Sequence, residues 1–155
     1  MKARFRKVFH RSLDSKGRLM LPPEYRDIVC AASSSGSFVL TGYDECIMAY
    51  TMPEWEAFEE KMDQLPSTNR VLRDLHRQMV GRSEELELDP QGRVRISQAL
   101  MRYAGLSKDV LLVGRGGKFE IWDTQRFEGL KSDDADAALA LAVKELALRG
   151  IDFSL

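Results

Sequence analysis

Apolar and polar residues alternate along two stretches of the chain, and each stretch is interrupted by a short polar turn. Around positions 89–93 the alternating apolar side chains are Leu86, Leu88, Val94 and Ile96. Around positions 14–18 they are Phe9, Leu13, Leu19 and Leu21. A period of two is typical of half-buried strands. The pattern therefore predicts two β-hairpins, one around each turn.

Both turns carry the same residues at their ends. Asp14 is followed three residues later by Gly17, and Asp89 by Gly92. In a type I turn an Asp at the first position accepts bonds from its own backbone, and a Gly at the fourth supplies a positive φ. Pro90 stands where such a turn favours proline. We therefore assign a structural role in the turns to these two Asp and two Gly residues.

Each predicted hairpin is followed by a helix signal and then by apolar runs. Pro22-Pro23-Glu24 favours a helix through Ile28, and Ser97 can cap a helix that stops at Gly105. The apolar runs predict further strands at 38–41, 46–50, 110–113 and 119–122.

Helical spacing dominates the remaining segments. A helix starting at Pro53 presents one apolar face, and a second stripe ends at Gly81; their members are Trp55, Phe58, Met62, Leu65, Val71, Leu72, Leu75 and Met79. Residues 66–69 form the break between them. Residues 134–149 predict a helix opened by Asp133 and Asp134 and closed by Gly150, with a stripe of Leu139, Val143 and Leu146.

The chain repeats itself in the same order. Residues 13–21 match residues 88–96 at a spacing of 75, and residues 39–42 match residues 111–114 at a spacing of 72. This predicts an α+β tandem duplication, with half-domains at 8–55 and 83–126, a helical connection at 56–82 and a C-terminal helical segment at 127–155. A half-domain of about 50 residues is marginal alone. The halves are therefore expected to pack together, and oligomers are expected too.

Basic and acidic residues are concentrated in different segments of the chain. The 155 residues hold 23 Lys+Arg against 24 Asp+Glu, a formal charge of −1. Residues 1–18 carry seven bases and one acid, whereas residues 53–63 carry five acids and one base. Such an asymmetry can attract a polyanion locally. A solvated N-terminus whose charges only confer solubility is the alternative, and composition leaves both open.

Several classes of protein are disfavoured. No apolar run is long enough for a membrane helix and no signal peptide is evident, so a cytoplasmic protein without a membrane partner is expected. Cys30 and Cys46 are isolated, which favours small buried apolar residues over a metal site. Residues 114–117 miss the phosphate-binding glycine patterns, and no cofactor is expected.

No catalytic group is evident either. Asp14 and Asp89 could be compared with a two-carboxylate dyad, but each is followed four residues later by an Arg that would keep it ionised. His10 and His76 lie near no partner for a triad or metal site and are expected on or near the surface. The sequence therefore predicts a protein that is not an enzyme.

The basic N-terminal hairpin is the remaining candidate site. Arg11 shares a face with Phe9 and Leu13, while Lys16 and Arg18 project from the turn. The major groove of DNA accepts a two-stranded ribbon, and Arg can bind guanine through two hydrogen bonds. In the alternative, Arg18 and Arg93 pair with the turn aspartates and stiffen the hairpins. RNA is disfavoured because the hairpin lacks interleaved exposed aromatic residues.

Combined motifs of the chain resemble those of the bacterial MraZ family. They are Asp14-Ser15-Lys16-Gly17-Arg18, Asp89-Pro90-Gln91-Gly92-Arg93, Leu19 to Pro22, Pro53-Glu54-Trp55, Gly105-Leu106 and residues 119–123. The resemblance implies tandem AbrB-like swapped-hairpin half-domains forming one pseudo-symmetric β-barrel with appended helices. It also implies a ring-shaped homo-oligomer associated with the nucleoid. This oligomer would regulate transcription at the promoter of the division and cell-wall gene cluster, its own gene included, by binding short direct repeats in double-stranded DNA.

Carried over to this chain, the resemblance implies DNA contacts by Lys16, Arg18, Arg93 and Gln91, with Arg6 and Arg11 beside them. Lys7 departs from the family, which usually has Gly there, and Gln91 stands where the first copy has Lys16. Equal contributions by the two motifs are therefore not implied. Activation or repression, the number of subunits, the bases read and the role of the acidic C-terminal segment stay open. The alternative function is an oligomeric interaction module whose basic hairpin binds an acidic protein.

Overall fold

The computed structural model describes residues 3–130 and 135–152. Contacts divide the chain into two compact units, Met1–Thr124 and Gln125–Leu155, which are described separately. Within the described residues no helix is both long and apolar enough to cross a membrane.

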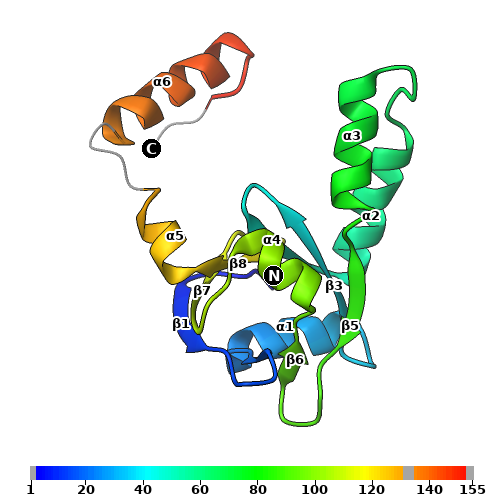
Figure 1. Ribbon diagram of the computed structural model, residues 1–155. Coiled ribbons are helices and arrows are strands. Elements are labelled where there is room, and N and C mark those ends of the chain that lie inside the picture. The colour runs from blue at the N-terminus through cyan, green and yellow to red at the C-terminus, as the bar shows by residue number, and fades with distance from the viewer. Residues whose placement is uncertain (1–2, 131–134, 153–155) are drawn as a thin grey trace. The chain divides into compact units, whose positions relative to one another are not determined.

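The first unit contains the same series of elements twice (Figure 1). The first copy consists of β1 (Val8–Ser12), β2 (Arg18–Met20), α1 (Pro23–Ala32), β3 (Ser37–Tyr43), β4 (Cys46–Thr51) and α2 (Met52–Asp63). After α3 (Arg70–Met79), the second copy consists of β5 (Glu84–Glu87), β6 (Arg93–Arg95), α4 (Gln98–Ala104), β7 (Asp109–Gly114), β8 (Lys118–Asp123) and the start of α5 (Thr124–Glu128). The α1 helix has 10 residues and α4 has 7, and this difference of three accounts for the change in repeat spacing from 75 to 72.

Strand pairing exchanges segments between the two copies. The main sheet has the order β1-β7-β8-β4-β3-β5, and all its pairs are antiparallel. The first strand of each copy lies beside the third strand of the other copy, since β1 pairs with β7 and β5 with β3. The short strands β2 and β6 pair with each other in a separate two-stranded ribbon. Neither copy could fold in this way without the other.

The prediction of two local hairpins is therefore wrong. The strands on either side of each turn are not partners: β1 pairs with β7, and β2 pairs with β6. The turn itself gives the physical reason, because Oδ1 of Asp14 accepts the backbone N–H of Arg18 and leaves only one backbone bond, from Asp14 N to Arg18 O, between the two arms. The chain then turns away from β1 and the ladder ends.

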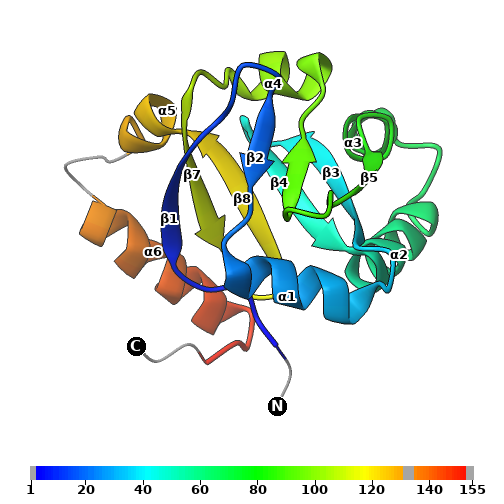
Figure 2. The same cartoon turned by 90° about the horizontal axis from the view of Figure 1, so that it is seen from below.

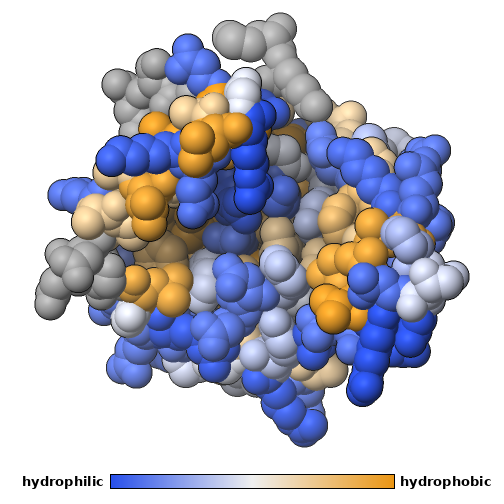
Figure 3. Space-filling view, turned by 90° about the horizontal axis from the view of Figure 1, so that it is seen from above, coloured by the Kyte–Doolittle hydropathy of each residue, from blue (hydrophilic) through white to orange (hydrophobic). Residues whose placement is uncertain are grey.

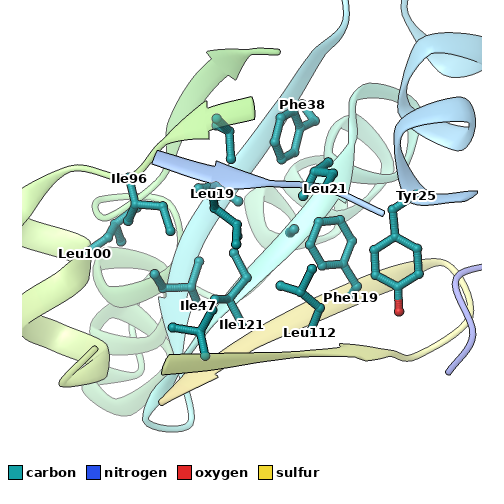
Figure 4. Close-up of a cluster of buried hydrophobic side chains, with 14 of the residues drawn as sticks. Leu19, Leu21, Tyr25, Phe38, Ile47, Ile96, Leu100, Leu112, Phe119 and Ile121 are labelled. Atoms are coloured by element: carbon teal, nitrogen blue, oxygen red, sulfur yellow. The ribbon is translucent and has the colours of Figure 1, made fainter. Parts of the chain in front are cut away.

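A core fills the space between the ribbon and the sheet (Figure 4). Leu19 and Val94 are buried on the inner side of the ribbon, with 0% and 1% of their surface exposed. They belong to one apolar cluster with residues of both copies, among them Ile47, Leu112 and Ile121. The core therefore holds the ribbon to the sheet and joins the two copies.

An aromatic group extends this core toward the N-terminal segment. The Tyr25 ring packs against Phe5, Phe9 and Phe119, with ring centroids 4.8–5.2 Å apart. Its hydroxyl donates to the backbone carbonyls of Arg6 and Lys7, and burial raises the pKa of Tyr25 to about 12. This tyrosine therefore fixes the segment that leads into β1.

The helix boundaries follow the predicted signals. Pro23 begins α1, and the Ser97 hydroxyl accepts the N–H of Leu100 at the start of α4. Gly105 ends α4 with a φ of 61°. These local features are confirmed because they depend on side chains adjacent in sequence.

Two smaller expectations are corrected. Cys46 is buried as predicted, but Cys30 is exposed on α1. Val71, assigned to an apolar stripe, has 74% of its surface exposed, whereas Met79 of the same stripe is buried. Near the start of α3 the apolar stripe does not reach the core. Some apolar side chains lie at the surface among hydrophilic ones (Figure 3).

The second unit contains the rest of α5 and the helix α6 (Ala135–Leu148). Gly150 follows α6 with a φ of 78°, as expected for a helix end. Val143 and Leu146 are half-buried, while Leu139 is exposed. The predicted opening residues Asp133 and Asp134 lie outside the described residues.

Candidate nucleic-acid interface

The first turn is held by a network centred on the Asp14 carboxylate. Its Oδ1 accepts the backbone N–H groups of Lys16 and Arg18, both at 2.9 Å. Its Oδ2 accepts Nε of Arg18 at 2.6 Å. These bonds, above all the one from the Arg18 backbone, lower the pKa of Asp14 from 3.8 to about 2. The carboxylate therefore stays ionised and fixes the base of the Arg18 guanidinium.

The second turn repeats this network. Oδ1 of Asp89 accepts the backbone N–H groups of Gln91 and Arg93 at 2.9 and 2.8 Å, and Oδ2 accepts Nε of Arg93 at 2.8 Å. The backbone bond from Arg93 is also the largest cause of the lowered pKa of Asp89. The side-chain Oε1 of Gln91 accepts a hydrogen bond from Nη2 of Arg93 at 3.3 Å. The predicted Asp–Arg pairs are thus confirmed in both copies.

The two turn glycines fit their predicted role. Gly17 and Gly92 have φ values of 75° and 81°. A methyl group on Gly17 would lie 3.3 Å from Sδ of Met101, and one on Gly92 would lie 2.9 Å from Cδ of Arg26. Met101 and Arg26 stand 75 residues apart, so each copy places the same helix position over the turn of the other copy.

The ribbon joins the two turns (Figure 2). In its register Arg18 lies opposite Arg95, Leu19 opposite Val94 and Met20 opposite Arg93. The central pair Leu19 and Val94 is buried, and side chains alternate between the faces of a strand. The outer face therefore carries Arg18, Met20, Arg93 and Arg95, which we call the ribbon face.

The ion pairs with the turn aspartates do not use all the hydrogen-bond donors of Arg18 and Arg93. A guanidinium has five N–H donors, and the Asp bond engages Nε. The side chains of Arg18 and Arg93 remain 33% and 29% exposed. Each arginine can therefore pair with its Asp and still offer donors to a further acceptor.

The predicted DNA-contact residues fall into two groups. Lys16 and Gln91 are exposed in the turns at opposite ends of the ribbon, next to Arg18 and Arg93. Arg11 lies on β1, where its Nη1 donates to the carbonyl of His10 and its guanidinium lies 5.5 Å from the centre of the Phe9 ring. Arg6 is exposed before β1, and the five residues of that strand separate it from the first turn.

Sequence reasoning missed three residues at this surface. No motif in the sequence singles out Arg95 or Met20, and only the pairing of β2 with β6 places them beside the two turn arginines. Arg26 was read as a helix residue, and it lies over the second turn. The 75-residue repeat contained the signal, because equivalent strands of swapped copies can pair about a two-fold axis.

Elsewhere the first unit has fewer features that suggest a ligand. A cavity of about 330 Å³ between α2 and α3 is lined by Met62, Asp63, Leu72, Arg73 and His76, among others. Nε2 of His76 lies 3.4 Å from Asp63 there. Among the described residues no group of three or more His, Cys, Asp or Glu could hold a metal ion.

This duplicated α+β fold and its cationic ribbon define a tandem-repeat protein with a candidate nucleic-acid surface. The sequence model described as "MraZ protein, putative antitoxin-like" matches residues 5–78 and again residues 79–150. The chain belongs to the MraZ family.

Curated relatives agree with this assignment over most of the chain. The transcriptional regulator MraZ of Nitratidesulfovibrio vulgaris (strain DSM 19637 / Miyazaki F) is 51% identical over 151 residues, which are 97% of this chain and 99% of the relative. The protein of the same name from Oleidesulfovibrio alaskensis is 45% identical, covering 93% and 94% of the two chains. That of Yersinia enterocolitica is 41% identical, covering 81% and 84%.

Proposed function

We propose that this protein is a sequence-specific DNA-binding transcriptional regulator and that the ribbon face contacts the DNA. The observation that carries the proposal is the register of β2 with β6, which brings both Asp-x-x-x-Arg motifs to one exposed cationic surface. The major groove, about 12 Å wide, accepts a two-stranded ribbon. The names of the relatives support the regulatory part of the proposal.

The geometry of the arginines suits reading of bases. The Asp14 carboxylate holds Nε of Arg18 in place, so that less side-chain freedom is lost when the remaining donors bind guanine O6 and N7. Asp89 does the same for Arg93. Exposed Lys16 in the turn is suited to a phosphate contact, which fixes position without reading sequence.

The two turns contribute unequally to binding. The first offers Lys16, whereas the second offers the neutral Gln91 and follows the acidic strand β5, which contains Glu84, Glu85 and Glu87. We therefore assign the stronger phosphate contact to the first turn. Arg6 and Arg11 add positive charge on the side of β1.

Each chain has few basic residues near the proposed DNA surface, which favours DNA binding by an oligomer. A protomer with about five to seven basic residues near the phosphates binds only modestly at physiological salt. Several protomers on one assembly raise the effective concentration for each later contact. This supports the ring-shaped homo-oligomer and the short direct repeats that the family resemblance implies.

Membership of the family supports three further proposals. The fold is an AbrB-like swapped-hairpin barrel with half-domains at 8–55 and 83–126. The protein is cytoplasmic and nucleoid-associated, and its target is the promoter of the division and cell-wall gene cluster, its own gene included. The exchange of β1 and β5 between the copies supports the swapped arrangement.

Fluorescence anisotropy tests the proposed function. The full-length protein is titrated onto duplex DNA from upstream of its own gene and onto a scrambled duplex, across a series of salt concentrations. We expect Arg18→Ala to weaken specific binding by about 5- to 150-fold, since one mispaired base contact typically costs about 1–3 kcal/mol. Lys61→Ala, an exposed site on α2, serves as the matched control and is expected to bind as the wild type does.

Two results would contradict the proposal. One is unchanged specific binding by Arg18→Ala. The other is equal weak binding of both duplexes by the wild type, together with capture of an acidic protein. That second result would favour the interaction module instead.

A further inference from the structure

The ribbon is nearly, but not fully, symmetric. The 75-residue repeat makes Arg18 equivalent to Arg93, and the register places these two arginines at opposite ends of the ribbon, as a two-fold axis through Leu19 and Val94 requires. The same axis relates Met20 to Arg95. One pair of ribbon-face positions is therefore identical in the two copies, and the other pair is apolar on one side and cationic on the other.

We infer that the difference between Met20 and Arg95 sets the direction in which each protomer lies on its DNA site. This inference rests on the proposed function, since it concerns the base readout by the ribbon face. Met20 and Arg95 affect the specificity of binding rather than its affinity, and neither belongs to an Asp-x-x-x-Arg motif.

Both side chains are placed to reach a ligand. Met20 is an apolar residue with 42% of its surface exposed, and Arg95 is also exposed. Arg95 forms no salt bridge within the described part of the chain. Met20 lies at one end of the ribbon and is not part of the core, which the ribbon contacts through Leu19 and Val94.

The chemistry of the two side chains is different at a base edge. Arg95 can donate two hydrogen bonds to guanine, whereas an apolar side chain such as Met20 favours contact with the methyl group of thymine. Positions two apart on a strand are separated by about 6.7 Å. Bases of one DNA strand are about 3.4 Å apart, so Arg18 and Met20 can address bases two steps apart.

The symmetry of the ribbon face determines whether the preferred DNA element is an inverted repeat. A ribbon with identical residues at both related positions would bind an element equally well in two orientations, and its preferred sequence would be an inverted repeat. With Met20 at one end and Arg95 at the other, only one orientation matches both contacts. Several copies that bind in a common orientation would then prefer direct repeats.

Lys16 and Gln91 also break the symmetry, but they lie in the turns beyond the ribbon. In the proposed DNA interface these two residues contact phosphates, which carry no sequence information directly. Exchanging these two residues therefore provides a matched control that alters charge at both ends without altering the ribbon face.

Selection of binding sites from random duplexes tests the inference, using the full-length protein and its variants. The wild type is expected to select a non-palindromic element. Met20→Arg and Arg95→Met make the ribbon symmetric, and each is expected to select an element closer to an inverted repeat. In Arg95→Met the preference at one base pair should fall about tenfold. The double variant is expected to select a non-palindromic element again.

The control Lys16→Gln with Gln91→Lys moves one positive charge from one turn to the other and should keep the selected sequence. The inference is overturned if Met20→Arg and Arg95→Met both select the wild-type element. Failure of the wild type to select any sequence would overturn the proposed function as well, so the two failures are distinguishable. Because both side chains lie on the outer face of the ribbon, the variants are expected to keep the thermal stability of the wild type, which circular dichroism checks.

Discussion

Leu19→Ala tests whether the two copies form one cooperative structure. Leu19 belongs to the first copy, is fully buried and lies opposite Val94 of the second copy. Its side chain packs in a cluster to which strands of both copies contribute. Removing it should therefore weaken both copies equally, although the change lies in only one of them.

The size of the effect follows from the burial. Truncating a fully buried Leu to Ala typically costs about 3 kcal/mol, from lost transfer free energy and the remaining cavity. With a urea slope of about 1.5–2 kcal/mol/M, the unfolding midpoint should fall by about 1.5–2 M without a change in slope. Met20→Ala, at the next residue, which is partly exposed, should change the free energy of unfolding by less than about 0.5 kcal/mol.

Two tryptophans make the assay specific to each copy. Trp55 follows β4 in the first copy, Trp122 lies in β8 of the second, and both are buried. Urea unfolding is followed by fluorescence in Trp122→Phe and in Trp55→Phe backgrounds. Equal shifts of both reporters by Leu19→Ala are expected. A shift of the Trp55 transition alone would refute the interlocked arrangement.

Three further perturbations have defined outcomes. Lys7→Gly should raise the stability by about 0.5–1 kcal/mol in thermal melts, because Lys7 has a φ of 72° and its ion pair is exposed; a loss of stability would contradict this. Gly114→Ala should cost about 1–3 kcal/mol, because its Cβ would lie 2.5 Å from the backbone nitrogen of Arg6, and a melt unchanged from the wild type would disprove that close approach. The folded pKa of Asp14 is lowered from 3.8 to about 2, so its contribution to stability is present above about pH 4 and lost as the pH falls through about 2. Asp14→Asn should therefore show a smaller fall of the urea midpoint between about pH 5 and about pH 2, and an equal fall would count against this role.

The sequence predicted the elements well where the signal is local. The turn aspartates, the positive φ of Gly17 and Gly92, and the Ser97 cap depend on residues a few positions apart, and all are confirmed. The Asp–Arg pair, considered as an alternative to DNA contact, is also present. Its geometry leaves donors for both roles, so the two readings do not exclude each other.

The sequence pattern does not predict which strands pair with each other. Alternation of apolar residues predicts that 18–20 is a strand, but an alternating strand can pair with any neighbour whose inner face matches. The partner β6 lies about 75 positions away, and the core contact of Leu19 with residues of both copies decides the pairing. Arg95 was missed for this reason, because its place beside Arg18 exists only in the exchanged register.

The family resemblance favours Gly at position 7, where this chain has Lys7. Lys7 has a φ of 72°, which a residue with a side chain rarely adopts. The Nζ of Lys7 lies 3.1 Å from Oε1 of Glu24. The backbone carbonyl of Lys7 accepts hydrogen bonds from the backbone N–H of Gly114 and from the hydroxyl of Tyr25. These contacts hold a conformation that a glycine would adopt without strain.

Photo-crosslinking identifies which surface of the protein contacts the DNA. A photoreactive residue replaces either Met20 on the ribbon face or Val71 on α3, both of which are exposed, and each protein is irradiated with duplex DNA from upstream of its own gene. We expect a crosslink to DNA from position 20, reduced by unlabelled specific duplex, and none from position 71. Crosslinking from position 71 without crosslinking from position 20 would show that the DNA contacts another surface.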